Sequence, residues 1–226
     1  MKWRMAAALV AAVVSGSGAA QAETARDWLT QAGFVDRDKA TALVHIDRAD
    51  RAAGAVLAKT PDDEEALLMQ AMALGYRAKL TSSRSMAMTA RKKYEALVQR
   101  FPRSAEAQIA LGAWHVALIH KLGAFVARAA TGAQRSIGIG ALDRGVQIGG
   151  SRAMVAGFAG MMRLQLDPAD PAGRALVERA AKAAAPTEVD VLVRRAATTI
   201  LAQIKAGNSD AVRTLSDKLL PFGQFS

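Results

Sequence analysis

Residues 90–112 read ARKKYEALVQRFPRSAEAQIALG, and this stretch decides the fold. Its key positions are a small residue, an aromatic residue, an apolar residue, a proline and a Leu-Gly pair: Ala90, Tyr94, Leu97, Pro102 and Leu111-Gly112. Small residues let two helices approach closely, and a proline ends a helix so that the chain can turn back. The spacing predicts a helical hairpin, with a clean unit over about residues 85–121.

The same pattern recurs, less cleanly, on both sides of this hairpin. Its members are Ala49, Ala53, Val56 and Pro61 upstream, and Gly138, Leu142, Gly145 and Gly150 downstream. The pattern resembles the tetratricopeptide repeat (TPR), although the units here are longer than its roughly 34 residues. Such hairpins bury their apolar faces by stacking on one another. We therefore expect an all-α protein, a right-handed stack of antiparallel hairpins (an α-solenoid) forming one domain over residues 23–226, with a capping helix at about 209–220.

Helical periodicity extends over the whole chain after residue 22, and no segment alternates as a strand would. Proline, glycine and capping residues divide this region into ten expected helices: 24–32, 36–59, 62–80, 85–100, 104–130, 134–148, 151–166, 171–185, 187–206 and 209–220. The helix at 62–80 is apolar on nearly every side. It should therefore be buried between its neighbours.

The first 22 residues have the layout of a cleavable signal peptide. Lys2 and Arg4 precede an apolar run from residue 5 to 14, and Ala20-Gln21-Ala22 provides small residues for cleavage. The run is about half of the roughly 20 residues that a transmembrane helix needs. We expect cleavage after Ala22, no transmembrane segment in the mature chain, and a periplasmic location in a double-membraned bacterium.

The chain is basic, with a net charge of +10, and it has no cysteine. Without cysteine there are no disulfides or thiolate sites. The positive charges are scattered, and Arg91-Lys92-Lys93 is the only run of three. A solvated basic surface is the simpler interpretation, while an acidic protein or an anionic surface is the kind of partner that such charge favours. Nucleic acid is not an expected partner, because export separates the protein from it.

A second resemblance lies in the segment that follows the clean hairpin. Its residues are Leu111-Gly112-Ala113-Trp114-His115, Leu122-Gly123, Ala127, Gly132-Ala133 and Ala141-Leu142-Asp143-Arg144. This segment resembles bacterial relatives of the regulators of microtubule dynamics, and a looser similarity links the chain to the periplasmic T component of TRAP transporters. The resemblance implies a helical scaffold with a binding face. Gly149-Gly150 departs from the pattern, which usually has proline there.

Residues that could carry chemistry are few and poorly placed. His115 and His120 are five positions apart, so they point about 140° away from each other on a helix and cannot easily share a metal ion. The acidic run at residues 62–65 begins a predicted helix, where carboxylates cap free amides. Glycines between 132 and 150 favour close helix packing. We therefore predict no enzyme activity, no metal and no cofactor.

The remaining hypothesis is binding. If the hairpins stack, the first helix of each lines a concave groove, whose predicted residues are Leu68, Met72, Tyr76, Ile109, Ala113, Val116 and His120. An apolar groove with methionines suits variable apolar partners. The leading prediction is a periplasmic scaffold for an unknown protein or peptide. The alternative is an accessory component of a transport system that binds an apolar small molecule or lipid. The seven groove residues could equally well be core side chains between the helix layers.

Overall fold

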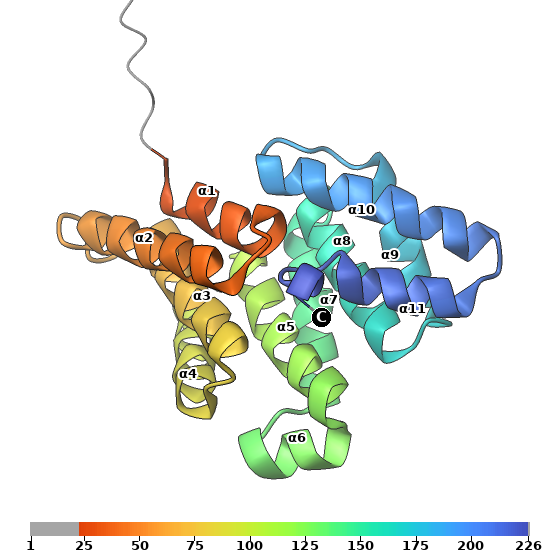
Figure 1. Ribbon diagram of the computed structural model, residues 1–226, viewed down its shortest axis with the longest axis horizontal. Coiled ribbons are helices and arrows are strands. Elements are labelled where there is room, and N and C mark those ends of the chain that lie inside the picture. Colours follow the sequence, from red (N-terminus) through yellow and green to blue (C-terminus); the bar gives the residue numbers. More distant parts are fainter. Residues whose placement is uncertain (1–22, 226) are drawn as a thin grey trace, which may run out of the picture.

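The computed structural model describes residues 23–225, so the predicted signal peptide lies outside the described residues. Within this range the protein is entirely helical, with eleven α-helices and no strand (Figure 1). The elements are α1 (Ala25–Thr30), the π-helix η1 (Gln31–Val35), α2 (Lys39–Leu57), α3 (Glu64–Thr81), α4 (Arg84–Arg100), α5 (Ala105–Leu122), α6 (Ala124–Thr131), α7 (Arg135–Gly149), α8 (Ala153–Leu166), α9 (Pro171–Lys182), α10 (Glu188–Lys205), α11 (Ser209–Lys218) and the 3-10 helix η2 (Gly223–Phe225). The all-α prediction is confirmed.

Short polar side chains begin most of these helices. An oxygen of each accepts a hydrogen bond from a backbone amide three residues ahead, which satisfies one of the free amides of the first turn. The capping residues of α2, α3, α4, α5, α9, α10 and α11 are Asp38, Asp63, Ser83, Ser104, Asp170, Thr187 and Asn208. The acidic run at 62–65 therefore caps a helix, as predicted, through Asp63.

Helices α1 to α4 form an N-terminal lobe, and α7 to α11 form a C-terminal lobe. Each lobe has its own hydrophobic core, and α5 contributes side chains to both cores. Helix α3 packs between α2 and α4 and also contacts α1 and α5; six of its 18 residues are buried and most of the others are half-buried. In the N-terminal core, Gly75 of α3 leaves room for Tyr94 of α4: a Cβ on Gly75 would lie 2.5 Å from the tyrosine hydroxyl.

Small residues bring α5 and α7 into close contact. A Cβ on Gly112 would lie 2.9 Å from the carbonyl oxygen of Gly138, and a Cβ on Gly145 would lie 3.1 Å from that of Ala105. Real Cβ atoms essentially never lie within 3.0 Å of such an atom, so Gly112 cannot gain a side chain without a shift of the backbone. The contact at Gly145 is tighter than most real Cβ contacts, so a side chain there would press on α5. Of the glycines between 132 and 150, Gly138 and Gly145 provide the expected close packing against α5, whereas Gly132 ends α6 with a positive φ and Gly140 has open space around it.

The prediction of one long helix over residues 104–130 is wrong. The chain breaks at Gly123, which has φ of 76° and ψ of 154°, a conformation that side-chain-bearing residues rarely adopt. The helical axis bends by 120° between α5 and α6. As a result α6 projects from the body of the molecule (Figure 1).

Residues 220–225, called here the C-terminal segment, lie against the N-terminal lobe. The backbone amide of Phe222 donates to the carbonyl oxygen of Gly33 at 2.8 Å, and Nζ of Lys79 donates to the carbonyl oxygen of Pro221 at 2.7 Å. The buried Phe222 ring packs edge-on against Tyr76, with their centroids 4.8 Å apart. The C-terminal segment therefore joins the two lobes.

Candidate functional site

The predicted groove is not an open surface. Leu68, Ile109 and Val116 are at most 5% exposed, and they belong to the two cores. Met72, Tyr76 and Ala113 are half-buried, and Phe222 of the C-terminal segment covers Tyr76.

His120 is the one exposed member of the predicted groove. Its Nε2 lies 3.0 Å from Oδ1 of Asp217. The predicted groove residues do lie on apolar helix faces, but most of those faces pack in the hydrophobic cores.

A different hollow opens between the lobes, and we call it the basic pocket. Its volume is about 280 Å³, and its walls come from η1 and the loop after it, α10, α11 and the C-terminal segment. It is lined by Phe34, Arg37, Leu192, Arg195, Ala196, Thr199, Lys218, Leu219, Leu220 and Gln224. Pockets between structural units are common ligand sites, so this position makes it the leading candidate.

The charges of the basic pocket all have one sign. Arg37, Arg195 and Lys218 are exposed, none of them forms an ion pair within residues 23–225, and the lining contains no carboxylate. Gln224 is held in place, since its Nε2 donates to the carbonyl oxygens of Gly33 and Asp36 at 3.2 and 3.1 Å. An apolar lining beneath several cations attracts a ligand that is both anionic and partly apolar.

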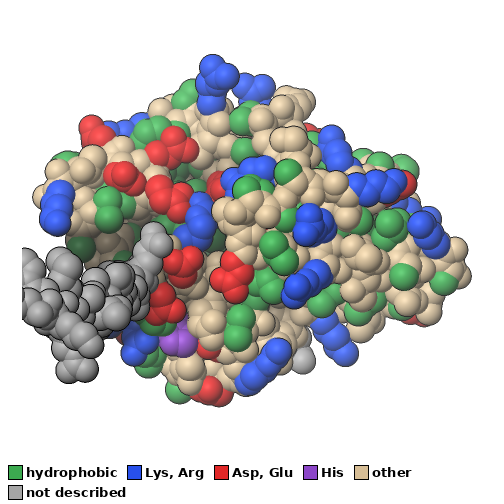
Figure 2. Space-filling view, turned by 90° about the horizontal axis from the view of Figure 1, so that it is seen from above, with side chains coloured by type: hydrophobic (Ala, Val, Ile, Leu, Met, Phe, Trp, Pro, Cys, Tyr) green, Lys and Arg blue, Asp and Glu red, His purple; other side chains and the backbone are tan. Residues whose placement is uncertain are grey.

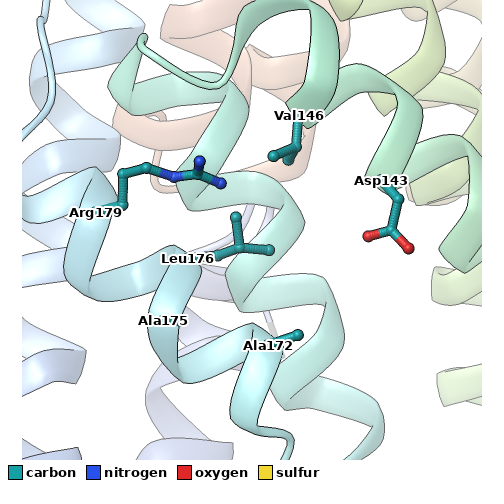
Figure 3. Close-up of a pocket in the computed structure, with 6 residues that line it drawn as sticks. All are labelled: Asp143, Val146, Ala172, Ala175, Leu176 and Arg179. Atoms are coloured by element: carbon teal, nitrogen blue, oxygen red, sulfur yellow. The ribbon is translucent and has the colours of Figure 1, made fainter.

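A second, shallower depression runs between α7 and α9 (Figure 3). Its volume is about 450 Å³, and its walls carry Asp143 and Val146 from α7 and Ala172, Ala175, Leu176 and Arg179 from α9. The carboxylate of Asp143 is already paired, at 2.6 Å, with Arg163 of α8. Arg179 is then the remaining charge, so this depression offers less specific recognition than the basic pocket.

Carboxylates gather elsewhere, in an ion-pair network that links the lobes. Arg26 contacts Glu65 at 2.6 Å and Glu106 at 2.7 Å, and Arg152 contacts Glu106 and Asp190 at 2.7 and 2.8 Å. Burial alone would lower the pKa of Arg26, but Glu65 and Glu106 raise it well above its usual value. Figure 2 shows acidic side chains gathered in one region of the upper face, while Lys and Arg are scattered over the rest.

Asp190 is the most buried member of this network. Burial alone would raise its pKa, but hydrogen bonds from Arg152, Thr187 and the amide of Met154 lower it below the usual range. Asp190 is thus a fully bonded carboxylate at neutral pH. The network stabilises the packing of the lobes and offers no group poised to exchange protons there.

His115 is completely buried and contributes to packing. Its Nδ1 accepts a hydrogen bond from the amide of Gln134 at 3.1 Å. Burial, with a further contribution from Arg91, lowers the pKa of His115 to about 4. The neighbouring Trp114 is 8% exposed, and its Nε1 donates to the carbonyl oxygen of Ala87 at 2.8 Å. Trp114 is therefore a packing anchor.

Three comparisons bear on identity. No protein-family model, no curated protein and no solved structure matches this chain. Within residues 23–225, no single helix has the length and apolar composition to cross a membrane, and α5 and α6 meet those criteria only as a bent pair.

The residues of the basic pocket were not identified from the sequence. Arg37, Arg195 and Lys218 lie far apart in the chain and belong to no motif. They are brought to one place by the packing of the C-terminal segment and α10 against the N-terminal lobe. One local feature of the sequence points to the pocket: Arg194-Arg195 has no acidic residue within three positions that could pair with it.

Proposed function

We propose that this protein is a non-catalytic binding scaffold of the TPR-like type, which holds an acidic, partly apolar segment of a partner protein in the basic pocket. One observation carries the proposal: three cations without ion-pair partners in residues 23–225 surround an apolar lining that contains no carboxylate. A carboxylate of the partner would supply the missing counter-charge.

Helix packing supports the TPR-like part of the proposal. Helices α2, α3, α4 and α5 each contact the next one in the chain, as stacked hairpins do. The motif residues Ala90, Tyr94 and Leu97 are buried at these contacts, and Gly112 permits the close approach of α7. This burial supports the proposal.

The chemistry of the pocket defines the partner segment. Phe34, Leu192 and Leu219 are half-buried and offer apolar contact, whereas Arg37, Arg195 and Lys218 offer hydrogen-bond donors. An arginine can hold a carboxylate with two parallel hydrogen bonds, which fixes orientation as well as charge. A segment with one apolar side chain next to Asp or Glu satisfies both halves of the pocket.

Selection from a displayed random-peptide library tests this proposal. The purified protein should enrich peptides in which Asp or Glu stands beside an apolar residue, and Arg195→Glu should weaken their binding at least tenfold. Arg103→Glu is the matched control, because Arg103 is exposed in the loop between α4 and α5, outside the pocket lining. Enrichment of basic peptides, or equal binding by both variants, would contradict the proposal.

A second candidate is the binding of a small anionic amphiphile, as in an accessory component of a transport system. The volume of about 280 Å³ lies near the lower end of the range of about 300–1,000 Å³ for small-ligand sites, so it suits only a small amphiphile. Native mass spectrometry distinguishes the two. A copurifying mass that disappears in Arg195→Glu supports the amphiphile, and a ligand-free protein that binds acidic peptides supports the scaffold.

Export to the periplasm is part of the proposed function. It rests on the layout of residues 1–22. Sequencing the N-terminus of the protein purified from the periplasmic fraction of the bacterium that produces it should give Glu23 as the first residue. A cytoplasmic product that keeps Met1 would contradict it.

A further inference from the structure

Helix α6 carries the most exposed large apolar side chain of the described residues. Phe125 is 86% exposed and Val126 is 50% exposed, and both lie in the first turn of α6, next to the partly exposed Leu122 at the end of α5. We call these three residues the α6 tip. It stands on the part of the molecule that projects furthest from the lobes (Figure 1). Exposed apolar groups of this kind usually mark an interaction surface.

The α6 tip is held firmly by the rest of the protein. The opposite face of α6 buries Ala127 and Thr131 against the body. At the end of the helix, Nε of Arg84 donates to the carbonyl oxygen of Ala130 at 2.8 Å, and Nη1 of Arg91 donates to that of Thr131 at 3.1 Å. Two side chains of α4 thus satisfy terminal carbonyls of α6. Phe125 is exposed because the packing directs it outward.

The side chains around the tip are basic. Lys121, Arg128 and Arg135 are exposed on α5, α6 and α7, and Arg84 of α4 is exposed beside the end of α6. The sequence contains no Asp or Glu between Glu106 and Asp143. Two carboxylates approach from other helices, and both have cationic or histidine neighbours: Glu95 of α4 is paired with Arg91 at 2.7 Å, and Asp217 of α11 lies 3.0 Å from Nε2 of His120. The tip therefore presents apolar side chains inside a rim of positive charge.

This combination fits an anionic lipid surface. A helix of eight residues is about 12 Å long, too small to bury the roughly 800 Å² that each partner contributes to a stable protein interface. Binding to a bilayer does not need so large a buried area. One aromatic ring can enter the headgroup region, and each nearby cation adds electrostatic attraction to anionic lipids. We propose that the α6 tip inserts Phe125 and Val126 into an anionic membrane surface while Lys121, Arg128 and Arg135 contact lipid phosphates.

Vesicle co-sedimentation tests the proposal. The wild-type protein should bind vesicles that contain phosphatidylglycerol and phosphatidylcholine, bind phosphatidylcholine alone much more weakly, and dissociate as salt increases. Phe125→Ser should weaken binding to the mixed vesicles about tenfold, from the loss of one buried aromatic ring. Arg128→Gln should weaken it about fivefold and leave binding to phosphatidylcholine unchanged.

Val44→Ser provides the matched control, since Val44 is 48% exposed on α2 and lies away from the tip. It should bind like the wild type. All variants are compared in one form of the chain, so that residues 1–22, if present, contribute equally. Thermal unfolding followed by circular dichroism should show that each variant is folded, because every substituted side chain is exposed.

Two results would overturn the proposal. One is wild-type protein that does not distinguish anionic from neutral vesicles. The other is folded Phe125→Ser protein that binds mixed vesicles as well as the wild type does, which would leave the tip to a protein partner. Neither result affects the basic pocket, whose peptide binding depends on Arg195 and is measured without lipid.

Discussion

His115 should make the protein progressively less stable as the pH falls from about 6.5 to about 4. Its ring is completely buried, its Nδ1 already accepts the amide proton of Gln134, and its pKa is lowered to about 4 in the folded state. In the unfolded chain the pKa returns to about 6.5. Between these values the unfolded state binds the proton and the folded state does not, so stability rises with pH across this window.

The size of the effect follows from the difference in pKa. Each unit corresponds to about 1.4 kcal/mol, so the shift from about 6.5 to about 4 corresponds to about 3 kcal/mol lost over the window. His115→Asn removes the imidazole that takes up the proton. The amide oxygen of the new asparagine side chain can replace Nδ1 as the acceptor for the backbone amide of Gln134. The variant should be less stable at neutral pH because the smaller side chain leaves a cavity.

Urea unfolding at a series of pH values measures the effect. The difference in free energy of unfolding between wild type and His115→Asn should shrink steadily as the pH falls through the window. His45 and His120 are present in both proteins, so their contributions cancel. Parallel curves, or a titration of the His115 ring near pH 6.5 by nuclear magnetic resonance, would refute the reasoning.

Three further predictions concern stability and use chemical or thermal unfolding. Phe222→Ala should cost about 3–5 kcal/mol, because it empties a buried site between the lobes, and retention of wild-type stability would show that the C-terminal segment does not join them. Asp190→Ala should cost about 3 kcal/mol at neutral pH, because Arg152 loses a buried partner. The lowered pKa of Asp190 means that this stabilisation is present above the ordinary Asp pKa and is lost as the pH falls through the folded value, so the gap between variant and wild type should close in acid. Gly123→Ala should cost about 1–3 kcal/mol, because φ is 76° there, whereas Gly54→Ala, in the last turn of α2 with open space around it, should stabilise by about 0.5–1 kcal/mol.

The helices could be predicted from the sequence because their causes are local. Capping residues such as Asp63 and Ser104, and the apolar periodicity between them, act within a few positions of the helix they define. Gly123 escaped detection because one glycine inside a helical pattern costs only about 1 kcal/mol, and the apolar pattern continues beyond it. The hydrogen bonds that hold the far end of α6 come from Arg84 and Arg91 of α4, which are distant in sequence from Gly123.

The candidate site could not be predicted, because it depends on contacts between distant residues. The groove prediction assumed that each hairpin packs only on its neighbours, which would have left Leu68 and Val116 facing a cleft. Instead the C-terminal segment covers Tyr76, and the two other residues are in the cores. The same long-range contact assembles the basic pocket from Arg37 and Lys218.

The C-terminal segment also has a consequence for how the protein unfolds. In a row of hairpins that touch only their neighbours, the outermost unit can fray while the rest stays folded. Here the side-chain amide of Gln224 donates to backbone oxygens 191 and 188 positions earlier in the chain, so η2 at one end is bonded to η1 and the residue after it at the other. Neither end can detach without breaking these two hydrogen bonds. We therefore expect the two lobes to unfold together. Because residues near the two ends of the described chain are bonded to each other, fraying should not begin at either end.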